Sequence, residues 1–176
     1  MYGYVKVGSA VPKLRVADCV YNKEEILKLV EAAAAKQVRV LSFPELSVTG
    51  YTCADLFFQA PLLHAAEQAI QEIAEATEAL NIFLLIGAPI AVDNQMFNCA
   101  VALYKGKLLG IVPKTHIPNY SEFYEERWFA SADDLLTEEI TYAGQNVPIG
   151  ADLIFAAADF PALKIGVEIC EDLWVT

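Results

Sequence analysis

The order in which strand-like and helix-like segments follow one another limits the possible folds more than any other feature of the sequence. Apolar runs of strand length occupy residues 5–11, 38–43 and 82–90. Between them lie two segments whose apolar residues recur at helical spacing, one at residues 22–37 and one that begins at Pro61. A chain that alternates strands and helices in this way folds as an α/β domain, with its helices packed against a sheet.

The second half of the sequence adds further strands. A Lys-Gly-Lys turn separates the apolar runs 97–104 and 108–113, which predicts a β-hairpin. Two more strands are predicted at residues 153–157 and 164–169. The last one is apolar on both faces, as in a strand from the middle of a sheet, and the sequence ends soon after it. We therefore expect that residues 1–176 form one domain whose C-terminal part is missing.

The charge of the sequence excludes two classes of partner. The net charge is −11 and the isoelectric point is about 4.5. Nucleic acids and anionic membranes both require a basic surface, so neither is an expected partner. Apolar stretches are too short to span a bilayer, and the N-terminus lacks the layout of a signal peptide, so we expect a cytoplasmic protein.

The cysteines predict neither a metal site nor a disulfide framework. Cys19, Cys53, Cys99 and Cys170 are far apart in the sequence and form no CxxC pair. Cys19 and Cys99 are expected to be small buried hydrophobic residues. No metal is expected at the functional site.

Polar residues follow the predicted strands at the points where hydrolytic chemistry is usually placed. Glu45, Lys114 and Cys170 each come at or just after the end of a strand, and such ends meet at one crevice in open α/β folds. A thiol can attack an acyl carbon if a base takes its proton and a cation lowers its pKa and stabilises the oxyanion. From position alone, the alternative is that these are ordinary loop charges and a core cysteine.

Three motifs favour the catalytic interpretation of Glu45, Lys114 and Cys170 over this alternative. They are FPELSVTGY at residues 43–51, VPKTHIPNY at 112–120 and GVEICEDLW at 166–174. In this order they resemble the base, lysine and cysteine segments of the nitrilase superfamily, in the form found in glutamine-dependent NAD synthetases. The resemblance extends over almost the whole sequence and implies a nitrilase-like αββα sandwich.

The resemblance also implies a role for each catalytic residue. Glu45 would be the general base, Lys114 the oxyanion stabiliser and Cys170 the nucleophile. A second glutamate commonly follows the lysine segment in this family; Glu122 fits that place best and would orient Lys114 or Cys170, with Glu125 as the weaker candidate. A dyad of His116 with Cys170 is an alternative that no motif supports.

The glutamine-using members further imply a substrate and a reaction. Tyr120 and Glu171 match positions that contact the amino-acid end of glutamine, whose ammonium group requires an anion. The expected reaction is hydrolysis of the glutamine side-chain amide through a cysteine thioester, which supplies ammonia for NAD synthesis. No cofactor is expected for this step. ATP and Mg²⁺ would serve a synthetase domain that these residues do not contain.

Two other functions remain open at this stage. The first is an amidase or carbamoylase of the same superfamily that acts on another small amide. The second is an inactive truncated module that folds only by pairing with another copy or with its missing half. The early end of the sequence leads us to expect that these residues alone form homo-oligomers and lack activity.

Overall fold

The computed structural model describes residues 3–175. Its main elements, in chain order, are β1 (Val7–Ser9), α1 (Cys19–Ala35), β2 (Val40–Ser42), α2 (Ala60–Ala76), β3 (Phe83–Val92), β4 (Gln95–Tyr104) and β5 (Lys107–Pro113). Short 3₁₀ helices are η1 (Ala54–Phe58), η2 (Glu125–Arg127), η3 (Ala132–Asp134) and η4 (Cys170–Leu173). The predicted alternation of strands and helices is confirmed.

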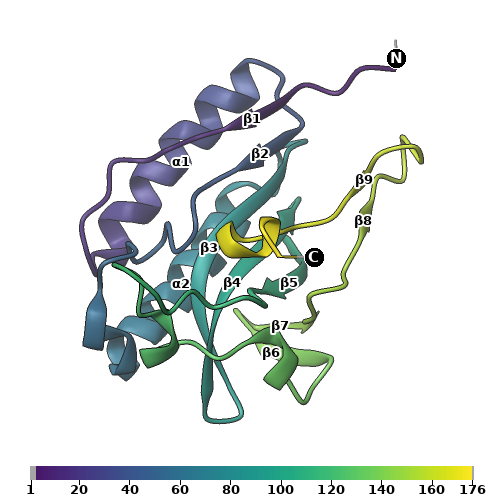
Figure 1. The fold of residues 1–176 in the computed structure, drawn as a ribbon. Coiled ribbons are helices and arrows are strands. Elements are labelled where there is room, and N and C mark those ends of the chain that lie inside the picture. Colours follow the sequence, from purple (N-terminus) through teal and green to yellow (C-terminus); the bar gives the residue numbers. More distant parts are fainter. Residues whose placement is uncertain (1–2, 176) are drawn as a thin grey trace.

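The five strands form one sheet in the order β1-β2-β3-β4-β5. The first three strands are parallel, and β3, β4 and β5 form an antiparallel meander. Each parallel connection contains one helix, and right-handed crossovers along the same direction place both helices on one face. Figure 1 shows α1 and α2 side by side behind the sheet, with the C-terminal segment on the opposite face.

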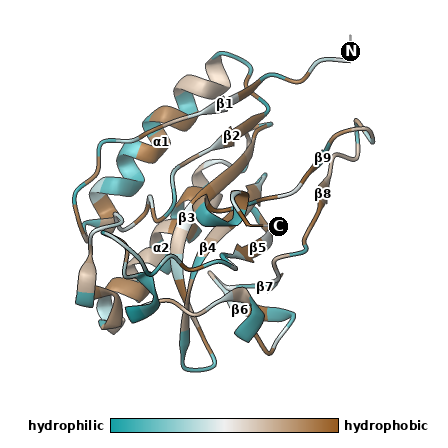
Figure 2. Cartoon of the chain, viewed as in Figure 1, coloured by the Kyte–Doolittle hydropathy of each residue, from teal (hydrophilic) through white to brown (hydrophobic). Residues whose placement is uncertain are grey.

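Apolar side chains hold the helices against the sheet. Ile26 and Val30 of α1, Ile70 and Ile73 of α2, and Ile86 of β3 are all fully buried. Burial of one such side chain contributes about 1.5–3 kcal/mol, so this layer fixes the position of the strands. The hydrophobic residues concentrate in β3 and β4 and on the sides of the helices that face them (Figure 2).

The start of α1 differs from the prediction. The sequence suggested that Asn22 caps the helix, whereas the helix begins earlier, with the Asp18 carboxylate accepting from the Tyr21 N–H at 3.0 Å. Asn22 lies one turn into the helix and is fully buried. Its amide bonds to the backbone of Arg15 and Val48, so it joins the segment before α1 to the loop after β2 rather than capping a helix end.

The last third of the chain also differs from the prediction. The hairpin of β6 (Glu139–Tyr142) and β7 (Gln145–Pro148) was not predicted. The two predicted C-terminal strands shrink to β8 (Phe155–Ala156) and β9 (Lys164–Ile165), which pair only with each other. Residues 164–168 are therefore half-buried or exposed, and the prediction of a central strand is wrong for this structure. Within residues 3–175, no helix has the length and apolar character required to cross a membrane.

Candidate active site

The sheet brings Glu45 and Lys114 to the same edge. Glu45 comes after β2 and Lys114 comes directly after β5. Because β4 is antiparallel to both of its neighbours, β5 runs in the same direction as β2 and β3. The ends of β2 and β5 therefore lie at one edge of the sheet, as expected from the sequence. Asn98 of β4 lies opposite Lys114, whose N–H donates to the Asn98 carbonyl at 2.8 Å.

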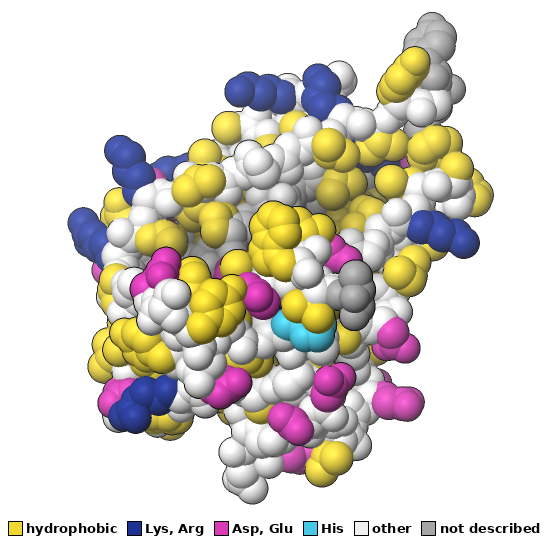
Figure 3. All heavy atoms as spheres, viewed as in Figure 1, with side chains coloured by type: hydrophobic (Ala, Val, Ile, Leu, Met, Phe, Trp, Pro, Cys, Tyr) yellow, Lys and Arg dark blue, Asp and Glu magenta, His cyan; other side chains and the backbone are white. Residues whose placement is uncertain are grey.

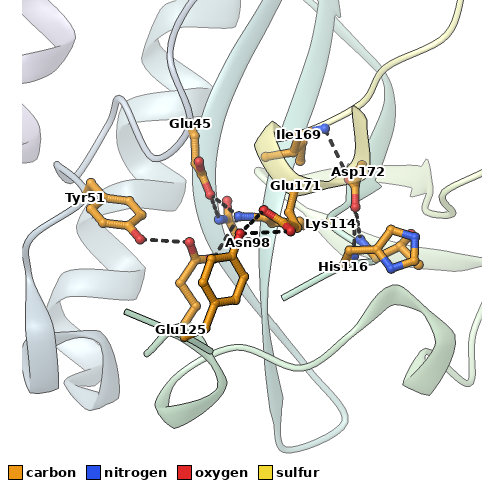
Figure 4. Close-up of polar contacts among 11 residues, drawn as sticks. Glu45, Tyr51, Asn98, Lys114, His116, Glu125, Ile169, Glu171 and Asp172 are labelled. Atoms are coloured by element: carbon orange, nitrogen blue, oxygen red, sulfur yellow. Dashed lines mark hydrogen bonds and ion pairs between the residues drawn. The ribbon is translucent and has the colours of Figure 1, made fainter. Parts of the chain in front are cut away.

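Lys114 is a fully buried cation between two carboxylates. Its Nζ lies 2.8 Å from Oε1 of Glu45 and 2.8 Å from Oε2 of Glu125. The exposed fractions of the three side chains are 0% for Lys114, 17% for Glu45 and 2% for Glu125. The Asn98 amide also donates to Oε1 of Glu45. Figure 4 shows these four side chains converging from the loop after β2, from β4, from the end of β5 and from η2.

The surroundings of Lys114 keep it charged. Burial alone lowers the pKa of this ammonium, but the hydrogen bonds and charges of Glu125 and Glu45 outweigh it, so the pKa is raised above 10.5. Two of the three ammonium N–H groups are used by these carboxylates. The third remains for another acceptor, as an oxyanion stabiliser requires.

The second glutamate of the site is Glu125, not Glu122. The sequence favoured Glu122, but that side chain is exposed, whereas Glu125 is buried against Lys114. The physical reason is the turn that ends in η2, where the Glu125 N–H donates to the Pro118 carbonyl at 3.1 Å. This closes the loop and directs Glu125 inward. The Tyr51 hydroxyl then donates to Oε1 of Glu125 at 2.8 Å.

The Cys170 turn is tied to the segment that carries the lysine. Oδ1 of Asp172 accepts the backbone N–H groups of Thr115 and His116 at 3.1 and 2.7 Å. Oδ2 of Asp172 accepts the Ile169 N–H at 3.1 Å. Cys170 has a φ of 49°, a left-handed conformation that is uncommon for a side chain with a Cβ and that this brace supports. The nucleophile candidate therefore sits on a fixed, sharp turn.

The thiol of Cys170 is neutral at rest. Partial burial raises its pKa above 9.0, and the negative charge of Glu45 raises it further, while Lys114 acts in the opposite direction. The sequence led us to expect that Lys114 lowers the thiol pKa; it does, but burial and the carboxylates outweigh it. A thiol of this kind requires a base at the moment of attack. Glu45, whose charge acts on this thiol, is the candidate for that base.

The predicted substrate-contacting residues meet at a cavity whose lining includes Glu171, the residue after Cys170, but not Cys170, Glu45 or Lys114 themselves. The Tyr120 hydroxyl lies 3.0 and 2.9 Å from the two carboxylate oxygens of Glu171. Both residues line a cavity of about 910 Å³, together with His116 and Trp128. On the face seen in Figure 3, acidic side chains lie among hydrophobic ones near the centre and below it, while Lys and Arg side chains lie toward the edges. No hydrogen bond within residues 3–175 joins His116 to Cys170, and the dyad alternative stays a hypothesis.

A charged clamp outside the cavity joins the loops that carry Tyr51 and Glu125. The Arg127 guanidinium donates from two nitrogens to Asp55 at 2.7 and 2.8 Å, and the Trp128 indole donates to the same carboxylate at 3.0 Å. This clamp connects η1 to η2. Sequence reasoning missed it, because the partners are more than seventy residues apart in the chain.

Sequence reasoning also missed Asn98 and Asp172. An isolated asparagine within an apolar strand was the available signal for Asn98, since a buried amide requires a partner. Cys19, Cys53 and Cys99 are buried and unpaired, as expected for Cys19 and Cys99. In the part of the chain that the structure describes, no group of three or more His, Cys, Asp or Glu side chains is arranged to hold a metal ion.

Comparison with known proteins gives the class of protein that this fold and site define. The family model described as carbon-nitrogen hydrolase matches residues 6–176, so the chain belongs to that family. The crystal structure of a glutamine-dependent NAD(+) synthetase from Cytophaga hutchinsonii superimposes with a TM-score of 0.86 at 30% identity, over 96% of this chain and 28% of that one. An amidase from Nesterenkonia sp. shares the fold at 19% identity, with a TM-score of 0.58 over 78% of this chain and 52% of that chain.

Curated relatives identify the particular branch that the chain resembles. It is 38% identical over 173 residues to a protein named glutamine-dependent NAD(+) synthetase from Mycobacterium leprae. The aligned region covers 98% of this chain and 25% of the relative. A rat protein of the same name is 32% identical over 180 residues, covering 92% of this chain and 24% of the relative. The chain thus spans about a quarter of the length of these relatives. The resemblance drawn from the three motifs and the nitrilase-like fold are confirmed.

Proposed function

We propose that this chain hydrolyses the side-chain amide of glutamine through a thioester on Cys170 and supplies the ammonia for NAD synthesis. The observation that supports this most strongly is the buried Lys114 ammonium held between two carboxylates, beside a neutral thiol on a sharp turn. A base, a fixed cation and a thiol are the groups required for acyl transfer from an amide.

The first half of the reaction forms the thioester. Glu45 takes the thiol proton as Sγ of Cys170 bonds to the amide carbon, and the carbonyl oxygen becomes an oxyanion. The third N–H of Lys114 and the peptide N–H of Glu171 hold that oxyanion. The C–N bond then breaks, the nitrogen takes the proton from Glu45, and ammonia leaves. A glutamyl thioester remains on Cys170.

The second half releases glutamate. A water molecule gives its proton to Glu45 while its oxygen bonds to the thioester carbon. The C–S bond breaks, and the Cys170 sulfur recovers its proton from Glu45. Glu125 takes no proton in this scheme; it fixes Lys114, and Tyr51 fixes Glu125. In each half of the reaction, Glu45 therefore first takes a proton and then returns it.

The cavity lined by Tyr120 and Glu171 suits the amino-acid end of glutamine. The Glu171 carboxylate follows the nucleophile directly and lines the cavity, where it can accept a hydrogen bond from an α-ammonium group. The Tyr120 hydroxyl orients that carboxylate. Asparagine is one methylene shorter, so its amide carbon would not reach Cys170 with the ammonium group on Glu171.

The ammonia has a use that the relatives' name suggests. Glutamine-dependent NAD(+) synthetase is the name of relatives at 38% and 32% identity. We propose that ammonia from Cys170 passes to a synthetase domain of the kind that uses ATP and Mg²⁺. That domain would be the principal partner of these residues.

A substrate panel tests the proposal. Ammonia release is measured with glutamine, asparagine and acetamide, for the wild-type protein joined to its proposed synthetase domain and for Cys170→Ala of the same protein. We expect turnover of glutamine well above that of the other two amides, and none by Cys170→Ala. Preference for acetamide would instead indicate an amidase for other small amides. A folded wild-type protein with no turnover of any amide would contradict the proposal and favour a non-catalytic module.

A further inference from the structure

Asn98 is a buried polar residue that the reaction described above does not use. It lies in β4, whose other described residues near it are apolar, and its side chain is fully buried. The amide nitrogen donates to Oε1 of Glu45. Its oxygen is buried and accepts no hydrogen bond from any residue of the described range 3–175. An unpaired buried acceptor is unfavourable for folding, so the residue calls for an explanation other than stability.

The sheet aligns Asn98 with Lys114. The two residues lie opposite each other on β4 and the end of β5, joined by the backbone bond from the Lys114 N–H to the Asn98 carbonyl. Opposed residues of an antiparallel pair project from the same face. Their side-chain nitrogens both bond to one atom, Oε1 of Glu45. A carboxylate oxygen with two fixed donors cannot rotate away without losing both.

We propose that Asn98 is a positioning residue that makes Oε2 of Glu45 the atom that accepts the catalytic proton. Oε1 is occupied by the Asn98 amide and the Lys114 ammonium, and no donor within residues 3–175 is bonded to Oε2. Lys114 alone would leave the carboxylate free to turn about a single contact. With Asn98 as the second donor, the carboxylate plane is fixed, and Oε2 is the oxygen left to accept the proton of the thiol or of water.

The unpaired oxygen of Asn98 agrees with this role. A carboxamide that is rotated by half a turn would place its oxygen against Oε1 of Glu45, where two acceptors repel each other. The amide is therefore held in one orientation by the carboxylate that it positions. Its oxygen lies without a partner because the opposite arrangement is worse.

The inference rests on the proposed function for its reaction steps, and its test is chosen to be separable from it. Asn98→Leu keeps the branched shape, with a slightly larger volume, and removes both polar groups, so the fold loses an unsatisfied acceptor along with the donor. Asn98→Asp keeps the shape and replaces the donor by an acceptor. Thr77→Val is the matched control, because Thr77 is also buried and hydrogen-bonded but lies at the end of α2, on the other side of the sheet.

With glutamine as substrate, both Asn98 variants should lower kcat by about ten- to a hundredfold, the size expected when a reacting group is misplaced by a fraction of an ångström to an ångström. KM should stay close to the wild-type value, because Asn98 is buried and touches no substrate. Thr77→Val should retain kcat. Wild-type kcat in either folded Asn98 variant, or a change in KM alone, would overturn the role.

A second measurement does not require glutamine. p-Nitrophenyl acetate, an activated ester, acetylates cysteine thiols, and loss of the acetyl group from Cys170 is followed by mass spectrometry. Loss of the acetyl group requires Glu45 to activate water, so it should slow in Asn98→Leu and Asn98→Asp by the same about ten- to a hundredfold factor and not in Thr77→Val. If wild type cleaves no glutamine but this difference remains, the proposed function fails and the role of Asn98 stands. Equal deacylation rates in all variants would overturn the role itself.

Discussion

Replacing Lys114 by methionine should destabilise the protein as well as inactivate it. The side chain is fully buried, and it is the ion-pair partner of Glu125, which is 2% exposed, and of Glu45, which is 17% exposed. Methionine has a similar length but no charge, so both carboxylates lose their cation. Breaking a buried ion pair by removing one partner costs about 3–5 kcal/mol, since the other charge is left uncompensated. That is a large share of a typical unfolding free energy of about 5–15 kcal/mol.

A less buried ion pair of the same chain provides the control. Lys23 and Glu72 join α1 to α2, and their side chains are 16% and 38% exposed, against 0% for Lys114 and 2% for Glu125. Lys23→Met should cost no more than about 1 kcal/mol, because the Glu72 carboxylate that is left behind is in contact with solvent. The free energy of unfolding is measured by urea denaturation followed by circular dichroism. The dependence of this free energy on urea concentration should be the same in all variants.

The neutral variant of the partner tests the cause. In Lys114→Met/Glu125→Gln, one of the two uncompensated charges is gone, so the double variant should be more stable than Lys114→Met alone. Glutamine hydrolysis should fall by about a hundredfold or more in both, because the oxyanion contact is absent. A cost for Lys114→Met no greater than that for Lys23→Met would refute the description of Lys114 as a buried bridging charge.

Further predictions concern the carboxylates around the thiol and the outer clamp. Glu45→Gln should abolish turnover, yet it should lower the pKa of Cys170, because the Glu45 charge raises that pKa. The pH at the midpoint of Cys170 alkylation should therefore decrease, and an increase would contradict the electrostatic coupling. Glu125→Gln should reduce kcat by about a hundredfold, whereas Glu122→Gln should leave it near wild type, since only Glu125 contacts Lys114. A larger loss of kcat in Glu122→Gln than in Glu125→Gln would restore the expectation from the sequence. Asp55→Ala should lower kcat modestly and increase amide hydrogen exchange in η2, because three donors lose their shared acceptor. An unchanged rate of exchange would show that the clamp does not stabilise η2.

Most of the fold followed from periodicity, and the errors have local physical causes. The strands 82–90 and the hairpin around residues 105–107 were predicted closely, because long apolar runs and a glycine turn are strong local signals. The cap of α1 was misplaced, because Asp18 and Asn22 are both good capping residues and only tertiary contacts distinguish them. The apolar run at 164–169 predicts a buried strand. A strand is buried only where other elements pack over it, and residues 164–168 are half-buried or exposed.

The site shows a similar division. Glu45, Lys114 and Cys170 stood at strand ends within recognisable motifs, and the structure brings the first two together in one ion pair. The sequence favoured Glu122 over Glu125, whereas Glu125 contacts Lys114; both lie in one acidic run, and the outcome depends on a turn closed by a single backbone bond. The positions of Asn98 and Tyr51 depend on pairs that are 53 and 74 residues apart, which no local pattern encodes.

The most direct test of the central claim is to trap the covalent intermediate on Cys170. The wild-type protein is mixed with glutamine, quenched in acid within its first turnovers, digested and analysed by mass spectrometry. The account predicts a glutamyl group on the peptide that contains Cys170. Turnover of glutamine with no adduct on Cys170, retained in Cys170→Ala, would contradict it.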